Sequence, residues 1–112
     1  MLLDYKLKAA AVCPSSISGY DREAATHMAV AVAIQSDSAD AGMGILSAAK
    51  AMDLDFIPVG DEEYDFAVPA EFLELACVRN FIEILKTPVL HAKIEELGGY
   101  TTECCGKVIP VE

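Results

Sequence analysis

The amino-acid sequence predicts an α/β fold in which a mainly parallel sheet is flanked by helices. Hydrophobic residues make up 54% of the 112 residues, and the excess lies in Ala, Val, Ile and Leu because aromatic residues are few. Segments with helical spacing of apolar residues alternate with short apolar segments typical of strands. Such alternation is typical of a parallel sheet whose strands are joined by helices. A chain of this length buries one core, so we predict a single domain over residues 1–112.

The predicted elements follow the order helix, strand, helix, strand, helix, strand, strand, helix, helix, with a short strand in the tail. Predicted helices cover residues 2–12, 24–36, 46–52, 69–85 and 88–97. Predicted strands cover residues 17–20, 41–45, 54–59, 64–68 and 108–111. No internal repeat, low-complexity tract or linker divides the sequence, so all of these elements are assigned to one domain.

The N-terminal elements rest on apolar spacing and on turn residues. Apolar residues at helical spacing predict the helix over residues 2–12, and Pro14 interrupts the pattern. Residues 24–36 are ambiguous because valines alternate with alanines as in a strand. The length and alanine content of this run favour a helix, for which Thr26 is a candidate N-cap. Small residues predict the strand over residues 41–45.

The C-terminal helices carry the clearest local signals. Pro69 opens a helix with apolar side chains on one face and charged side chains on the other. Thr87 followed by Pro88 is typical of a cap and a first helical residue. Gly98 and Gly99 then predict the end of this second helix.

The charge of the chain excludes several kinds of partner. Eight basic residues stand against eighteen acidic ones, which gives a net charge of −10 at pH 7. A nucleic-acid-binding surface needs clustered Lys and Arg to displace counterions, and binding to an anionic membrane has a similar requirement. We therefore predict no direct nucleic-acid or membrane partner. A small anion remains compatible with the charge, because helix N-termini bind anions locally.

Export and membrane signals are missing from the sequence. The longest apolar run, residues 29–34, is much shorter than the roughly 20 residues that span a bilayer. The N-terminal segment contains Asp4 and lacks a long apolar stretch, so it does not match a signal peptide. These observations predict a cytoplasmic location, in which the four cysteines are reduced thiols.

Catalysis has no positive support in the sequence. There is no glycine-rich phosphate loop, no nucleophile elbow and no zinc-protease motif. The cysteines also lack the C-x₂-C spacing typical of zinc sites. We predict no catalytic residue, no metal and no cofactor. A site formed by His91, Cys104 and Cys105 is left open as the basis of a metal-dependent enzyme.

Two segments are candidates for ligand binding. Residues 23–28 begin a predicted helix, where the Thr26 hydroxyl, free N–H groups and His27 together suit a small anion. The alternative is an ordinary N-cap beside a surface histidine. In residues 39–45, two glycines near a strand end allow close approach of a ligand. Tight packing of strand on helix explains those glycines equally well.

Six short motifs, taken together, point to a known family. They are Gly19-Tyr20, Glu23–His27, Ala39–Ile45, Leu54–Pro58, Tyr64-Asp65 and Leu97–Tyr100. In this order they resemble the PBP-like domain family of the type 2 periplasmic-binding-protein superfamily. That family is found attached to molybdopterin molybdotransferases and to helix-turn-helix regulators. The resemblance extends from Leu2 to about Lys107.

The resemblance implies a fold and a set of site residues. It implies one lobe plus the return segment of a type 2 periplasmic-binding-protein fold. Residues 1–60 would form the core of the second lobe, and residues 64–112 would form a crossover strand and the C-terminal helices. The chain would correspond to the second half of the family's domain only. The implied ligand-binding residues are Thr26, His27, Met43, Gly44 and Tyr64.

The resemblance also implies a ligand class. The family is similar to molybdate- and tungstate-binding proteins of transporters, which hold an oxyanion between two lobes. We therefore expect a non-enzymatic small-ligand-binding module, for an oxyanion such as molybdate or tungstate, linked to molybdenum-cofactor biosynthesis or its regulation. The alternative is an interaction or oligomerisation module that completes a partner chain without binding ligand itself. Either function implies a homo-oligomer or a partner chain that supplies the missing lobe.

Overall fold

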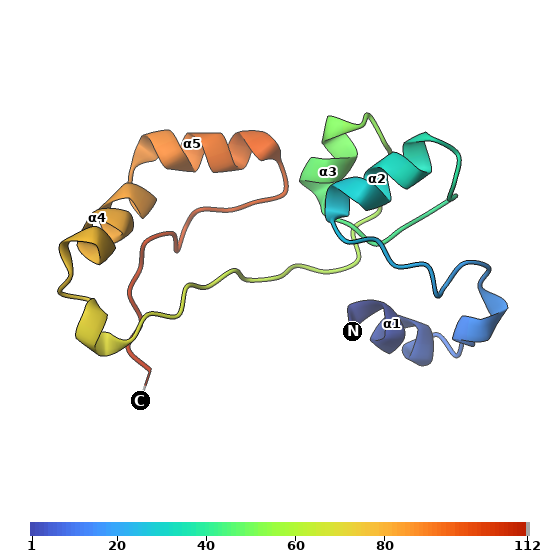
Figure 1. Cartoon of the computed structure of the whole chain (residues 1–112), viewed down its shortest axis with the longest axis horizontal. Coiled ribbons are helices and arrows are strands. Elements are labelled where there is room, and N and C mark those ends of the chain that lie inside the picture. The colour runs from blue at the N-terminus through green and yellow to red at the C-terminus, as the bar shows by residue number, and fades with distance from the viewer. Residues whose placement is uncertain (112) are drawn as a thin grey trace. The chain divides into compact units, whose positions relative to one another are not determined.

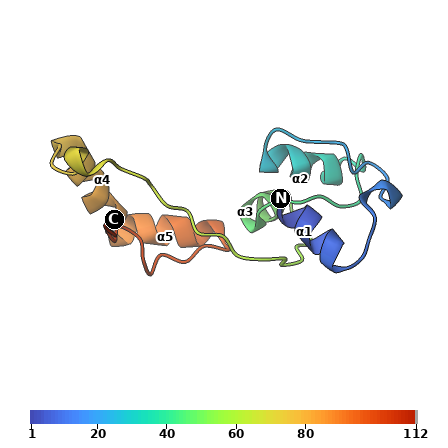
Figure 2. The same cartoon turned by 90° about the horizontal axis from the view of Figure 1, so that it is seen from below.

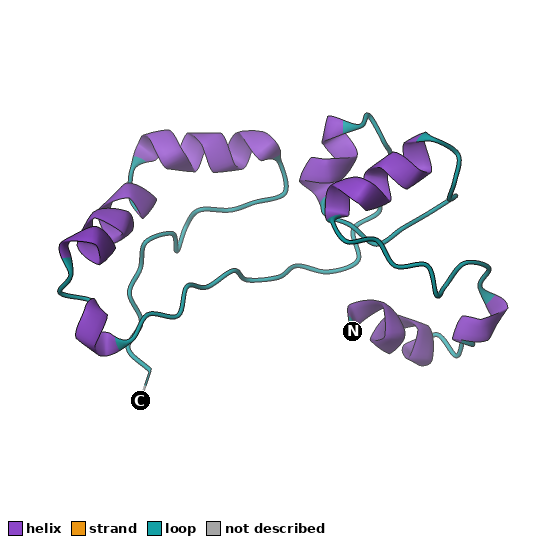
Figure 3. Ribbon diagram, viewed as in Figure 1, coloured by secondary structure: helices purple, strands orange, loops and turns teal. Residues whose placement is uncertain are grey.

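The computed structural model describes residues 1–111. The chain forms two compact units. The first unit is Met1–Asp55, and the second begins at Phe56. Within residues 1–111 every regular element is a helix, as Figure 3 shows in purple. The boundary between the units lies inside the predicted strand over residues 54–59. The prediction of one domain over residues 1–112 stays a prediction.

The first unit contains α1 (Leu2–Ala9), a 3₁₀ turn η1 (Pro14–Ser16), α2 (His27–Gln35) and α3 (Leu46–Ala51). Helices α2 and α3 pack side by side, as Figures 1 and 2 show from two directions. Their contact contains the buried apolar side chains of residues 1–111, which are Ala31, Ala48 and Ala49. Small side chains let two short helices approach closely, so this contact forms a small core.

The loop between α2 and α3 is held against α2 by Gly42. A β-carbon built on Gly42 would overlap the Val30 side chain and would lie 3.5 Å from Ile34 Cδ1. Beyond α3, the Leu54 N–H donates to the Ala49 carbonyl at 2.9 Å. The Gln35 side chain donates to the Met52 carbonyl at 3.4 Å. The Gly42 contact holds the loop before α3 against α2, and the Gln35 bond ties Met52, which follows α3, to α2.

The second unit contains a 3₁₀ turn η2 (Ala70–Phe72), α4 (Ala76–Leu85) and α5 (Pro88–Leu97). The helices α4 and α5 are consecutive and contact each other. The tail after α5 is fastened by Thr102, the buried polar residue of the described chain. Its hydroxyl donates to Glu95 Oε1 on α5 at 2.5 Å.

The predicted α/β fold is wrong, because the described residues contain no strand and therefore no sheet. Residues 17–20 form a turn in which the Tyr20 N–H donates to the Ile17 carbonyl at 3.3 Å. The segments 41–45, 54–59, 64–68 and 108–111 have no strand pairing. A strand is stabilised by hydrogen bonds to a neighbouring strand, and these segments have no such neighbour. The apolar pattern of each segment favours an extended conformation, but it does not supply the second strand with which the segment would have to pair.

The predicted helices are confirmed in outline, with changed ends. Helix α1 ends at Ala9 rather than at residue 12, and Ala11 has a positive φ of 55°. The helix predicted from Pro69 is divided, because α4 begins only at Ala76 after the short turn η2. The caps are confirmed at both predicted threonines: Thr26 Oγ1 accepts from Ala29 N at 3.0 Å, and Thr87 Oγ1 accepts from Leu90 N at 3.4 Å.

Much apolar surface stays exposed in both units. In the second unit the apolar face predicted for the helix from Pro69 is exposed, at Phe72 and Leu75 before α4 and at Phe81 on α4. In the first unit Met28 and Val32 on α2 are exposed as well. No helix within residues 1–111 is long and apolar enough to cross a membrane.

Candidate functional site

The N-terminus of α2 is the best-defined of the predicted binding features. Thr26 has an extended backbone (φ −142°, ψ 156°) and caps the helix by accepting the Ala29 N–H. The Val30 N–H donates to the Thr26 carbonyl at 3.2 Å. Within residues 1–111 the N–H groups of His27 and Met28 have no acceptor, as expected in a first helical turn. Two backbone donors and an exposed imidazole therefore lie together at this helix end.

The glycine-containing loop before α3 has two different roles at its two glycines. Gly42 packs on α2, which agrees with the packing explanation of the motif. A β-carbon built on Gly44 would meet nothing within 4 Å, so this position is open. Met43 lies between them and is exposed. The loop thus offers an accessible surface at Met43 and Gly44, while Gly42 holds the loop in place.

The five predicted ligand-binding residues fall into two groups. Thr26 and His27 are adjacent at the start of α2, and Met43 and Gly44 lie in the next loop of the same unit. Tyr64 belongs to the second unit, in an extended segment, and is exposed. The role of these residues in binding stays a prediction.

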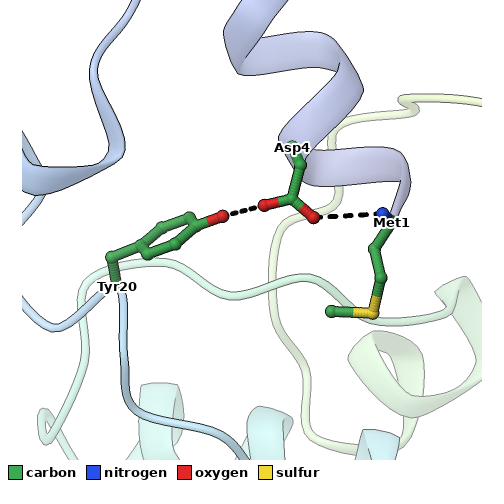
Figure 4. A network of polar contacts seen from close by, with 3 residues as sticks. All are labelled: Met1, Asp4 and Tyr20. Atoms are coloured by element: carbon green, nitrogen blue, oxygen red, sulfur yellow. Dashed lines mark hydrogen bonds and ion pairs between the residues drawn. The ribbon is translucent and has the colours of Figure 1, made fainter.

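A polar network that was not expected from the sequence joins α1 to the turn before α2. Figure 4 shows that the two oxygens of the Asp4 carboxylate are engaged by different groups. The Tyr20 hydroxyl donates to Oδ1, and the Met1 amino group pairs with Oδ2 at 3.1 Å. In the sequence Tyr20 stands out only as part of the Gly19-Tyr20 motif. Its pairing with Asp4 across the turn has no signal in the local sequence.

The network shifts the pKa of both side chains. The Tyr20 hydrogen bond, helped by the Met1 amino group, lowers the pKa of Asp4 below its ordinary value of 3.8. The same bond raises the pKa of Tyr20 above 10.0. Because the folded pKa of Asp4 is lowered, its contribution to stability is present above pH 3.8 and is lost as pH falls through the lowered pKa. The contribution of Tyr20 is present below pH 10.0 and is lost as pH rises through the raised pKa.

The substitution Tyr20→Phe is expected to raise the pKa of Asp4 towards 3.8, because it removes the hydrogen bond that lowers this pKa most. NMR titration of the Asp4 carboxyl carbon measures the change. Tyr5→Phe is the matched control, because Tyr5 is an exposed tyrosine on α1 without a bond to Asp4. An unchanged Asp4 pKa in Tyr20→Phe, or an equal rise in both variants, would contradict the assigned network.

The cysteines and histidines do not gather into a metal centre. Within residues 1–111 no three His, Cys, Asp or Glu side chains are placed to hold a metal ion. The His91 ring Nε2 lies 2.7 Å from the Leu85 carbonyl oxygen and is engaged there. Cys77, Cys104 and Cys13 are exposed thiols. A hydrogen bond with the Ser15 hydroxyl lowers the pKa of the Cys13 thiol.

The sequence matches the family described as the PBP superfamily domain over residues 1–86. The chain belongs to this family, which confirms the family predicted from the six motifs. The match covers the whole first unit and continues through α4.

Two relatives extend the match along nearly the whole chain. The chain is 38% identical over 109 residues to YvgK, an uncharacterised protein of Bacillus subtilis, covering 97% of this chain and 35% of YvgK. It is 29% identical over 110 residues to an uncharacterised protein encoded upstream of a 2Fe-2S ferredoxin gene in Clostridium pasteurianum, covering 97% of each chain. The chain thus spans about a third of YvgK and nearly all of the clostridial relative. No solved structure matches this sequence.

Proposed function

We propose that this chain is a non-enzymatic binding module that holds a small oxyanion, such as molybdate or tungstate, at the N-terminus of α2. The observation that carries the proposal is the pair of N–H groups at His27 and Met28 that have no acceptor within residues 1–111. Helix N-termini bind anions through such groups, aided by the helix dipole. Membership of the PBP superfamily domain supports a binding role.

The side chains at this helix end have the donors that an oxyanion needs. Thr26 Oγ1 accepts the Ala29 N–H, which leaves its own hydroxyl proton free to donate to an anion oxygen. The His27 imidazole supplies a further N–H donor. We propose that Met43 and Gly44 contact the same ligand from the neighbouring loop of the same unit. With a net charge of −10, the attraction for an anion must come from these local groups rather than from the whole chain.

The proposed setting is the cytoplasm, where the module would serve molybdenum-cofactor biosynthesis or its regulation. We propose no direct contact with nucleic acid or membrane. A second copy of the chain, or a partner chain, would supply further walls of the binding site. Two-sided enclosure of the anion would add donors that a single exposed helix end lacks.

Molybdate or tungstate is expected to raise the melting temperature of the purified chain, because a ligand that binds the folded state stabilises it. The gain is about 2.7 kcal/mol at a ligand concentration a hundred times the dissociation constant. Sulfate and phosphate, titrated in the same way, report on selectivity among tetrahedral anions. Differential scanning fluorimetry over a range of anion concentrations measures the effect.

Two cap variants separate binding from stability. Thr26→Ala and Thr87→Ala each remove a threonine that caps a helix, so each is expected to cost about 1 kcal/mol. Only Thr26→Ala should also abolish the rise in melting temperature caused by the anion. No rise with any of the four anions, or an equal loss of the rise in both variants, would count against the oxyanion function.

A second candidate function is an interaction module that completes a partner without binding ligand itself. It is favoured by the shortage of buried apolar side chains, which in residues 1–111 are three alanines, beside extensive exposed apolar surface. Soluble monomers rarely expose large continuous apolar patches, and such patches mark association sites. Light scattering coupled to size-exclusion chromatography tests this function. A strictly monomeric chain that also binds no added protein or peptide would exclude it.

A further inference from the structure

Residues 56–68 form an extended segment whose backbone is open to a partner. The segment begins the second unit and contains no helix and no strand. No N–H or carbonyl group of residues 56–68 is hydrogen-bonded to another residue within 1–111. An extended chain with unpaired backbone groups is a template for a second chain, because main-chain hydrogen bonds can form along its length.

The side chains of this segment add an apolar surface to the open backbone. Ile57 is 83% exposed, Tyr64 70% and Phe66 67%. The Phe66 ring also meets the Phe81 ring of α4 edge-on, with centroids 5.0 Å apart and planes at 86°. This contact fastens the C-terminal end of the segment to α4. The apolar surface continues onto α4 at Phe81 and Ile84, which are themselves exposed.

The negative charge of residues 56–68 indicates which kind of surface can bind to them. Between Lys50 and Arg79 the sequence has no basic residue. The acidic residues inside the segment are Asp61, Glu62, Glu63 and Asp65. Within residues 1–111 none of these four carboxylates forms an ion pair.

A second copy of the chain fits this segment poorly. Two copies paired along it would place carboxylates close to carboxylates, and like charges facing each other across paired chains are destabilising. The net charge of −10 on each copy opposes self-association further. A surface with Lys and Arg is the complementary one. The surface that fits this segment therefore has apolar side chains at its centre and Lys and Arg side chains around them.

We propose that residues 56–68 are a docking segment for a protein partner that presents an extended, Lys- and Arg-flanked apolar edge. The partner would pair with the open backbone, cover Ile57, Tyr64 and Phe66, and neutralise the four carboxylates. This inference rests on the interaction function proposed above and names the surface and the chemistry of the partner. It is independent of oxyanion binding at α2, which lies in the other unit.

The test uses a synthetic peptide of alternating Lys and Val, with a peptide of alternating Glu and Val as the reference. Fluorescence anisotropy measures binding to the full chain, and hydrogen exchange maps the protected amides. We expect saturable binding of the basic peptide alone, with protection concentrated in residues 56–68. Binding should weaken between about 50 mM and about 300 mM NaCl, because salt screens exposed charges.

Two charge variants make the assignment specific. The first carries Asp61→Asn, Glu62→Gln, Glu63→Gln and Asp65→Asn in the segment. The second carries Asp21→Asn, Glu23→Gln, Asp37→Asn and Asp40→Asn, exposed acids of the first unit, and changes the net charge equally. Only the first is expected to bind the basic peptide roughly tenfold more weakly, which corresponds to about 1.4 kcal/mol.

Three results would contradict the proposal, and each would contradict a different part of it. Equal weakening in both variants, or protection of residues outside 56–68, would overturn the docking segment and leave the interaction function standing. Protection of residues 56–68 by self-association, without any peptide, would replace the basic partner with a second copy. No binding of either peptide, together with a strictly monomeric chain, would overturn both the segment and the interaction function.

Discussion

The substitution Ala31→Glu is expected to abolish the packing of α2 against α3. Ala31 is 4% exposed and is the residue of α2 that lies buried in this contact. The new carboxylate would be taken out of water at the contact with α3, where the buried side chains are Ala48 and Ala49. An uncompensated buried charge costs about 3–5 kcal/mol, a large part of the stability of a domain of this size. Far-UV circular dichroism during urea unfolding measures the loss.

The neighbouring substitution Val32→Glu is the matched control. Val32 lies on the same helix, and its side chain is 44% exposed, so a carboxylate there stays in water. Surface substitutions of this kind usually change stability by about 0.5 kcal/mol or less. Similar unfolding midpoints for Ala31→Glu and Val32→Glu would mean that α2 and α3 do not form a core in solution.

The substitution Gly42→Ala is expected to destabilise the first unit by about 1–3 kcal/mol, the usual cost of overpacking. The added β-carbon would overlap the Val30 side chain. Val30 is a β-branched residue on a helix and has one strongly preferred rotamer, so it cannot easily turn away. The loop must then shift away from α2. Urea unfolding followed by circular dichroism measures the change in the unfolding midpoint.

Two further variants test whether Val30 is the cause. Gly44→Ala should be nearly neutral, because its β-carbon would meet nothing within 4 Å. In a double-mutant cycle, Val30→Ala should relieve most of the added cost of Gly42→Ala, since neighbouring substitutions of this kind are coupled. A Gly44→Ala variant as unstable as Gly42→Ala would show that loop flexibility, rather than contact with α2, decides stability here.

Features that depend on a few neighbouring residues were predictable from the sequence. Thr26 and Thr87 each cap a helix, as their positions before the apolar runs indicated. Gly98 ends α5 with a φ of 82°, a conformation that glycine adopts readily. In each case one side chain, or its absence, decides the conformation of the next turn. The free energy of such a cap or helix end depends on neighbouring residues and hardly on the rest of the fold.

The lack of a sheet in residues 1–111 was not predictable from the sequence, because strands depend on distant partners. Residues 64–68 have a strand-like apolar pattern, yet they are extended without pairing. The site shows the same contrast. Thr26 and His27 share one helix end, as expected from their adjacency, whereas Tyr64 lies in a different unit. The bond between Asp4 and Tyr20, sixteen residues apart, was missed for the same reason.

The small core also bears on how long the protein survives in a cell. Proteases and chaperones act on chains that open readily, and marginal stability therefore lowers abundance. Within residues 1–111 the buried apolar side chains are three alanines. So small a core contributes little free energy to hold the chain in its folded state. Copies without a covering partner are expected to be degraded first. Under the proposed interaction function, the amount of this protein would follow the supply of the partner, so that overproduction of the chain alone would yield little lasting gain.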